Sequence, residues 1–330
     1  MNSVLAFLLG LGALVVGAEM VVREGSALAA RFNVSPLVVG MTIVSLGTSL
    51  PELAVGLNAA QQGNGGMAVG NIVGTNLVNI LLILGLSALI RPIAFEAQTL
   101  RLDLPAMTGA ALLLLCVAAD GDLDTFDGIW LCLYGAAYLT LLAVLARRES
   151  RRPVVPAAGA PSPSTNPDTT DAPPVRARPV AVRALLLVLG LSVVVVGSEY
   201  LVDGAVGIAR GMGVSDAVIG LTVVAVGTSA PEFVTTVVST VRGDRSIAVG
   251  NLIGSSVFNI ALILGPTVLV ASGTVPVPGD VLALDLVLMV AAAVMCVPVF
   301  LTHRRLGRVE GGAFVMTYAA YMVWLLSTRL

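Results

Sequence analysis

The stretch LGTSLPELAVG at residues 46–56 places polar groups where the chain is otherwise apolar. It carries Gly47, Thr48, Ser49, Pro51 and Glu52 inside a segment long and hydrophobic enough to cross a membrane. A second stretch, VGTSAPEFVTT at residues 226–236, repeats the pattern GTSxPE. A helix breaker, two hydroxyls and a carboxylate at membrane depth are costly, so their repetition indicates a functional site.

The composition is that of an integral membrane protein. Hydrophobic residues make up 57% of the chain and charged residues only 12%, against about 25% in soluble domains. All 18 basic residues are arginines, the net charge is −2, and no basic patch with interleaved aromatics suggests nucleic-acid binding. The three cysteines are isolated in apolar segments and are expected to be core residues, not metal ligands or disulfides.

Hydropathy predicts an all-α protein with ten transmembrane helices. The expected spans are residues 3–22, 36–60, 67–90, 102–119, 126–146, 183–202, 216–241, 247–271, 282–301 and 311–327. Residues 147–182 are rich in Pro, Ala, Ser and Thr without apolar periodicity, and are predicted to be a disordered linker. This divides the chain into a first transmembrane unit, 1–146, and a second, 183–330.

The arginines predict the orientation of these spans. With both termini outside, 16 of the 18 arginines fall on the inner side, and only Arg210 and Arg329 fall outside. The linker is then cytoplasmic, and the protein is expected to be a multi-pass component of the cell membrane.

The two units are an internal repeat. Shifted by 180 residues, Gly17–Gly85 aligns with Gly197–Gly265 without a gap, with about 27 identities in 69 positions. Five spans in each unit is an odd number, so the second unit must lie inverted relative to the first. Inverted repeats with discontinuous helices, here helices 2 and 7, are typical of secondary transporters, whose sites lie near the bilayer midplane.

The repeated motif supplies oxygen ligands. Glu52 and Glu232 would be retained at membrane depth to meet a cation. Pro51 and Pro231 lack an amide hydrogen, which frees carbonyls one turn earlier, and Thr48, Ser49, Thr228 and Ser229 add hydroxyls. Such hard oxygens suit Ca²⁺, Na⁺ or Mg²⁺, and Ca²⁺ fits best because it accepts irregular coordination.

A second repeated pattern, GNIVGTNLVN at 70–79 and GNLIGSSVFN at 250–259, is predicted to complete the site. Asn79 and Asn259 would contribute neutral amide oxygens, and the glycines would allow close helix packing. Glu19 and Glu199 also correspond under the repeat but lie toward span ends, as do Asp103 and Asp285 at span starts; all four are expected to be mainly structural.

With these two motifs, the chain resembles the sodium/calcium exchanger branch of the calcium/cation antiporter superfamily. The resemblance implies alternating access, with Glu52 and Glu232 shared by Ca²⁺ and Na⁺. It also implies that the backbone carbonyls of Ser45 and Ala225, with Thr75 and Ser255, join the ion ligands. Asparagine at both position 79 and position 259 suggests no K⁺ requirement, and GTSxPE disfavours H⁺ as the counter-ion.

Other functions were weighed against this one. An intramembrane hydrolase would need a serine with a base, an aspartate dyad or a histidine cluster, and no histidine lies in a span. A cation channel could also use acidic residues, but broken helices in inverted repeats favour a transporter. We therefore expect no enzyme activity and no cofactor, with Ca²⁺ and Na⁺ as transported ions, the bilayer as surroundings and one chain as the functional unit.

Overall fold

A computed structural model describes residues 2–150, 179–213 and 225–329. The chain is helical, with several π-helical segments (η) and four strands of two residues each, which the all-α prediction did not include. The first half contains α1 (Ser3–Phe32), α2 (Pro36–Val39), η1 (Gly40–Val44), α3 (Ser45–Thr48), α4 (Leu50–Gln61), α5 (Gly65–Leu77), η2 (Val78–Ile83), α6 (Leu84–Ile90), β1 (Ile93–Ala94), η3 (Thr99–Asp103), α7 (Leu104–Val117), β2 (Asp122–Leu123) and α8 (Thr125–Ser150).

The second half repeats this order of elements from α3 onward. It contains α9 (Val180–Gly211), α11 (Ala225–Thr228), α12 (Ala230–Arg242), α13 (Arg245–Phe258), η5 (Asn259–Leu264), α14 (Gly265–Val270), β3 (Val275–Pro276), η6 (Val281–Asp285), α15 (Leu286–His303), β4 (Arg305–Leu306) and α16 (Arg308–Arg329). The strands pair across the halves, β1 with β4 and β2 with β3, both antiparallel. The two strand pairs therefore connect the first half of the chain to the second by backbone hydrogen bonds at two separate places.

Eight helices within the described residues are long and apolar enough to cross a membrane, and they become nine if a bent pair counts as one span. The bent pair is 36–48 with 50–61, which meet at an angle of 44°. The first part of the span expected at 216–241 lies outside the described residues. The chain is thus a helical, multi-pass membrane protein.

Several helices differ in length from the expected spans. α1 continues to Phe32 and α9 runs from Val180 to Gly211, both well past the ~20 residues that a bilayer requires. Of the linker expected at 147–182, residues 147–150 belong to α8 and residues 180–182 to α9, with Pro179 as the N-cap of α9. The remaining residues, 151–178, lie outside the described residues. Hydropathy marks only the part of a helix that lipid surrounds, so it underestimates helices that continue beyond the lipid.

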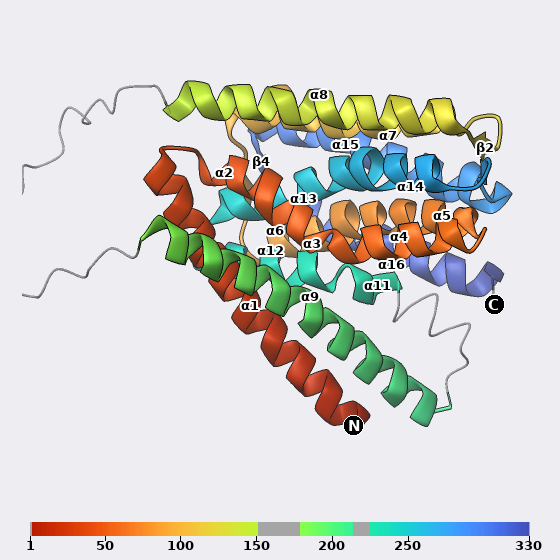
Figure 1. Ribbon diagram of the computed structural model, residues 1–330, viewed down its shortest axis with the longest axis horizontal. Coiled ribbons are helices and arrows are strands. Elements are labelled where there is room, and N and C mark those ends of the chain that lie inside the picture. Colours follow the sequence, from red (N-terminus) through yellow and green to blue (C-terminus); the bar gives the residue numbers. More distant parts are fainter. Residues whose placement is uncertain (1, 151–178, 214–224, 330) are drawn as a thin grey trace, which may run out of the picture.

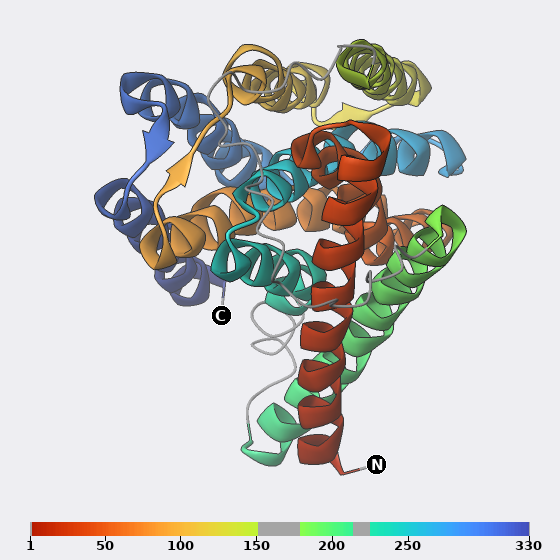
Figure 2. The same ribbon diagram turned by 90° about the vertical axis from the view of Figure 1, so that its left-hand side faces the viewer.

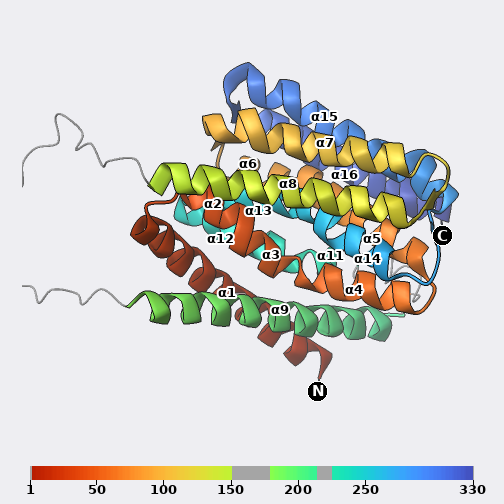
Figure 3. The same cartoon turned by 45° about the horizontal axis from the view of Figure 1, so that its top comes forward.

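The helices that carry the second polar pattern lie at the centre of the molecule. In the spans Gly65–Ile90 and Arg245–Val270, 78% and 94% of the most apolar window is buried, against 22% in α8, α9 and α16. Around this centre, α7, α8 and α15 lie on one side and the pair α1 and α9 on the other (Figures 1 and 3). The two helices that carry the second polar pattern are therefore the most buried of the candidate membrane spans in the described residues.

α1 and α9 form an antiparallel pair whose N-terminal and C-terminal ends, respectively, extend beyond the other helices (Figures 1 and 2). Glycines allow the two backbones to approach closely. A Cβ added at Gly17 would lie 2.8 Å from the carbonyl oxygen of Gly190, and one at Gly10 would lie 2.7 Å from that of Gly197.

A second close crossing places the first broken helix against α13. A Cβ at Gly250 would lie 2.9 Å from the amide nitrogen of Met41, and one at Gly40 would lie 2.8 Å from the carbonyl oxygen of Ile247. Small residues at this crossing bring α3 and α13 into contact. The crossing therefore brings polar residues from both halves of the chain together.

Candidate ion-binding site

Each GTSxPE motif forms a break between two helices. Ser49 separates α3 from α4 with φ −87° and ψ 9°, and Ser229 separates α11 from α12 with φ −84° and ψ 8°. Pro51 and Pro231 lie in the first turn of the second helix, where a missing amide hydrogen costs no helical hydrogen bond. The motif predicted the position of the break in both halves.

The breaks place both glutamates in the first turn of a helix. Glu52 lies in the first turn of α4 and Glu232 in the first turn of α12, where the helix dipole favours a negative charge. Both side chains are 0% exposed. The site that they form is thus closed to solvent.

Among the described residues, these carboxylates have no partner of opposite charge. Neither oxygen of Glu52 and only Oε1 of Glu232 has a hydrogen-bond partner among the described residues. That one bond comes from the hydroxyl of Ser49 in the opposite half, at 3.2 Å. Buried carboxylates in this state must either bind a cation or be protonated, because burial of an uncompensated charge is strongly unfavourable.

Buried hydroxyls from the first break lie beside the carboxylates. The hydroxyl of Thr48 lies 3.1 Å from Oδ1 of Asn251, an amide that itself donates to Thr236 Oγ1 at 3.2 Å. The carbonyl of Ser45 accepts from the amide of Ser49 at 3.1 Å and lies 3.3 Å from the Thr48 hydroxyl. This carbonyl, expected as an ion ligand by resemblance, therefore already has partners within the chain.

The second break presents matching groups. Ser229 is fully buried and its hydroxyl has no partner among the described residues, whereas Thr228 is half-buried. Ala225 is the first residue of α11. The two breaks thus offer a similar set of oxygens to the space between them.

The four predicted residues of the second pattern are all buried, and each has at least one polar atom without a partner in the described part of the chain. These atoms are Thr75 Oγ1, Asn79 Oδ1 and Nδ2, Ser255 Oγ and Asn259 Oδ1. The asparagines lie in π-helical segments, η2 and η5, at matching positions of the two halves. Single π-helical turns inside α-helices are common at functional sites because they redirect side chains.

This arrangement is chemically a cation site of hard oxygens. Two carboxylates supply the charge, and hydroxyl and amide oxygens supply neutral ligands. Among the described residues, no group of three or more His, Cys, Asp or Glu side chains could hold a metal ion. Neutral oxygens must therefore complete the coordination of any ion held by Glu52 and Glu232.

Two residues of this region were not found from the sequence. Thr236 holds the amide of Asn251, and Asn76 accepts from Nδ2 of Asn259 at 3.4 Å. The predicted site consists of polar residues that recur in both halves, but position 236 corresponds to Gly56 and position 76 to Ser256. Polar residues that differ between the repeats would have been the signal.

Three of the four acids expected to be mainly structural have partners outside the site. Asp103 lies 3.4 Å from the hydroxyl of Tyr138, and the corresponding Asp285 accepts from Tyr321 at 3.1 Å. Glu19 forms an ion pair with Arg242 that joins α1 to α12. None of these three acids is needed to complete the cluster around Glu52 and Glu232.

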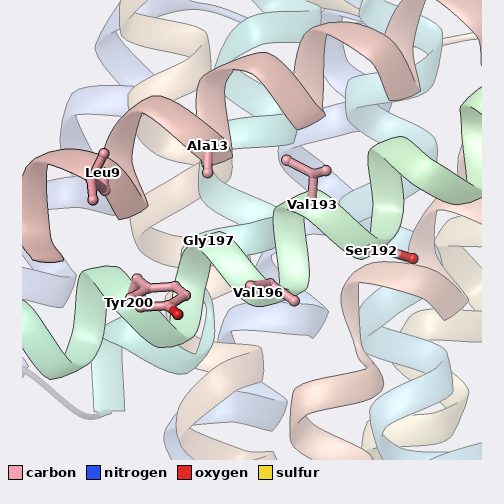
Figure 4. Close-up of a pocket in the computed structure, with 7 residues that line it drawn as sticks. All are labelled: Leu9, Ala13, Ser192, Val193, Val196, Gly197 and Tyr200. Atoms are coloured by element: carbon pink, nitrogen blue, oxygen red, sulfur yellow. The ribbon is translucent and has the colours of Figure 1, made fainter.

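A large apolar groove lies away from this site. It measures about 500 Å³ and runs between α1 and α9, lined by apolar side chains that include Leu9, Ala13, Val193, Val196 and Tyr200 (Figure 4). It contains no carboxylate and faces outward from two helices that are candidate membrane spans. Its chemistry suits lipid contact and not cation binding.

Comparison with known proteins shows the family of the chain. A family model described as sodium/calcium exchanger protein matches residues 2–144 and 182–327. The inner membrane protein YrbG of Escherichia coli is 36% identical over 318 residues, covering 96% of this chain and 94% of that protein. The sodium/calcium exchanger MaX1 of Methanosarcina acetivorans is 33% identical over 356 residues, covering 97% of each.

A solved structure, the sodium/calcium exchanger from Methanococcus jannaschii, has a similar fold, with a TM-score of 0.81 at 28% identity over 98% of both chains. Because the family model covers both halves and relatives match over nearly the whole chain, this protein belongs to the sodium/calcium exchanger family.

Proposed function

We propose that this protein exchanges Ca²⁺ for Na⁺ across the cell membrane by alternating access. One observation carries the proposal: two fully buried carboxylates meet at matched helix breaks, and three of their four oxygens have no partner among the described residues. Membership of the family supports cation antiport in general. The hard-oxygen ligand set supports Ca²⁺ as one ion and Na⁺ as the other.

The proposed architecture is ten transmembrane helices in two inverted repeats of five, with helices 2 and 7 discontinuous. Residues 1–146 form the first repeat, 147–182 a disordered cytoplasmic linker and 183–330 the second repeat. The recurring order of elements supports this division. The arginine distribution supports termini on the outside.

The proposed ion ligands come from both halves. Glu52 and Glu232 carry the charge that Ca²⁺ and Na⁺ compete for. Hydroxyl, amide and carbonyl oxygens complete the sites, from Ser45, Thr48, Ser49, Thr75, Asn79, Ala225, Thr228, Ser229, Ser255 and Asn259. Because one chain supplies all of these groups, we propose that the monomer is sufficient, without cofactor or enzymatic activity.

Uptake of ⁴⁵Ca²⁺ into proteoliposomes with imposed Na⁺, K⁺ or H⁺ gradients tests this function. We expect an outward Na⁺ gradient to drive Ca²⁺ accumulation and K⁺ or H⁺ gradients of equal size to have no effect. Uptake driven only by H⁺ would instead identify a calcium/proton antiporter. Uptake that saturates and depends on the ion inside the vesicle would distinguish exchange from a channel.

A further inference from the structure

The amide of Asn259 is held in one orientation. Its Nδ2 donates to Oδ1 of Asn76 at 3.4 Å, while its own Oδ1 is buried and has no partner among the described residues. Asn259 is 0% exposed and Asn76 is 1% exposed, so water cannot take over the hydrogen bond. The amide thus keeps its oxygen free for a ligand.

The orientation of Asn76 is determined in turn by Met289 of α15. Nδ2 of Asn76 lies 3.6 Å from the sulfur of Met289, which is 1% exposed. A thioether sulfur accepts hydrogen bonds weakly and cannot donate them. The amide nitrogen of Asn76 therefore faces the sulfur, and its oxygen faces Asn259.

Turning over either amide in this series of hydrogen bonds, from Asn259 through Asn76 to Met289, is unfavourable. If Asn259 alone turned over, two amide oxygens would face each other, and the amino group of Asn259 would replace its oxygen as the group available to an ion. If both asparagines turned over, the oxygen of Asn76 would face the sulfur, and two acceptors would again be opposed. A buried polar group left without a partner is costly, so the observed polarity is preferred.

We propose that Asn76 is a positioning residue that keeps the amide oxygen of Asn259 available to the transported cation. The inference rests on the proposed function, because it assumes that Asn259 is an ion ligand. Asn76 touches no ion itself and acts only through the amide of Asn259. Its contribution is to prevent an amino group, which repels cations, from replacing a ligand oxygen.

The two repeats differ at this point. Position 76 corresponds to Ser256, whose hydroxyl donates to the carbonyl of Leu252 in its own helix at 2.9 Å. Asn79, the counterpart of Asn259, has no partner for either amide atom within the described residues. The amide of Asn259 is therefore held by a residue of the other repeat, Asn76, whereas the amide of Asn79 has no such partner among the described residues.

The test measures Na⁺-driven ⁴⁵Ca²⁺ uptake by the full chain in proteoliposomes. Asn76→Ser introduces the residue that the other repeat carries and is too short to reach Asn259. We expect it to raise the apparent KM for Ca²⁺ roughly ten-fold, with kcat changed less than about two-fold. Met289→Leu removes the terminal acceptor and should raise KM by a smaller factor, about three-fold.

Two controls separate positioning from general damage. Ser256→Ala, at the matched position, should leave KM within about two-fold of the wild type. In an Asn259→Asp background, Asn76→Ser should change KM less than about two-fold, because a carboxylate presents an oxygen whichever way it turns. Membrane insertion and thermal stability of each variant show whether it folds.

Three results would overturn the proposal. These are an unchanged KM in Asn76→Ser, an equal rise in Ser256→Ala, or the same rise whether residue 259 is Asn or Asp. A wild-type protein that shows no cation-driven Ca²⁺ uptake would instead refute the proposed function. A wild type that exchanges normally beside an unaffected Asn76→Ser variant would refute the positioning role alone.

Discussion

Replacing Glu52 by glutamine removes one negative charge from the ion site and keeps the shape of the side chain. Glu52 is fully buried, and neither of its oxygens has a partner among the described residues. The substitution therefore breaks no hydrogen bond that the structure shows for this carboxylate. The substitution should therefore change the stability of the ion-free protein and that of the ion-bound protein in opposite directions.

The magnitude follows from the burial of the charge. Removing one partner from a buried charge pair costs about 3–5 kcal/mol, which corresponds to roughly 150- to 5,000-fold in Ca²⁺ affinity. Without the ion, the same change replaces an unpaired buried charge by a neutral amide, whose burial costs less than that of the charge. Glu52→Gln should therefore be more stable than wild type in chelator and less stable than wild type in saturating Ca²⁺.

Two assays measure these effects. Thermal unfolding in detergent, with and without Ca²⁺, should show a higher Tm for the ion-free variant and no Ca²⁺-dependent rise. Na⁺-driven ⁴⁵Ca²⁺ uptake should fall to background in Glu52→Gln and in Glu232→Gln. As a matched control, Glu19→Gln alters a half-exposed glutamate paired with Arg242 and should retain uptake within about two-fold. Wild-type uptake, or a full Ca²⁺-dependent Tm rise, in Glu52→Gln would refute the assignment of this carboxylate.

Three further predictions test the cross-repeat contacts, the packing and the charge. Ser49→Ala removes the donor to Oε1 of Glu232 and should raise the KM for Ca²⁺ about ten-fold in the uptake assay, whereas an unchanged KM would contradict a role for this bond. Gly311→Ala would place a Cβ 2.7 Å from the carbonyl oxygen of Gly85 and should lower the free energy of unfolding by about 1–3 kcal/mol, measured by thermal unfolding. The adjacent Gly312→Ala, whose Cβ meets nothing closer than 3.7 Å, should have little effect, and equal losses in both variants would contradict the packing argument. If three Na⁺ exchange for one Ca²⁺, each cycle moves one net positive charge, which couples to voltage by ~2.3 kcal/mol per 100 mV. An inside-positive potential set by K⁺ and valinomycin should then speed Ca²⁺ uptake. Voltage-independent uptake would indicate an electroneutral exchange.

The positions of the helix breaks could be predicted from the sequence because their cause is local. Proline cannot continue a helix from the preceding turn, so Pro51 and Pro231 locate the breaks within a residue or two. Repetition of the motif then indicated that both glutamates share one site. In the structure, each glutamate lies in the first turn of the helix after the break, and each is fully buried.

The contacts between the repeats could not be predicted in the same way. The link from Asn251 to Thr236 and the link from Asn76 to Asn259 depend on which helices cross and at what distance. Both involve a residue whose counterpart in the other repeat differs, so a search for symmetry passes over them. At positions where the two repeats carry different residues, the repeats can also differ in function.

The charge of the site gives a physical reason why the proposed transport should be an exchange. Glu52 and Glu232 place two negative charges in a region closed to solvent, and each charge at membrane depth costs at least ~2.5–3.5 kcal/mol. An empty site with both carboxylates ionised would have to bear this cost while it reoriented, whereas one Ca²⁺ or two Na⁺ would neutralise it. Under the proposed function, the empty carrier would therefore reorient more slowly than the loaded carrier, and release of one ion would have to be followed by binding of the other. The two carboxylates proposed to bind the cation would then also enforce the coupling between the two fluxes.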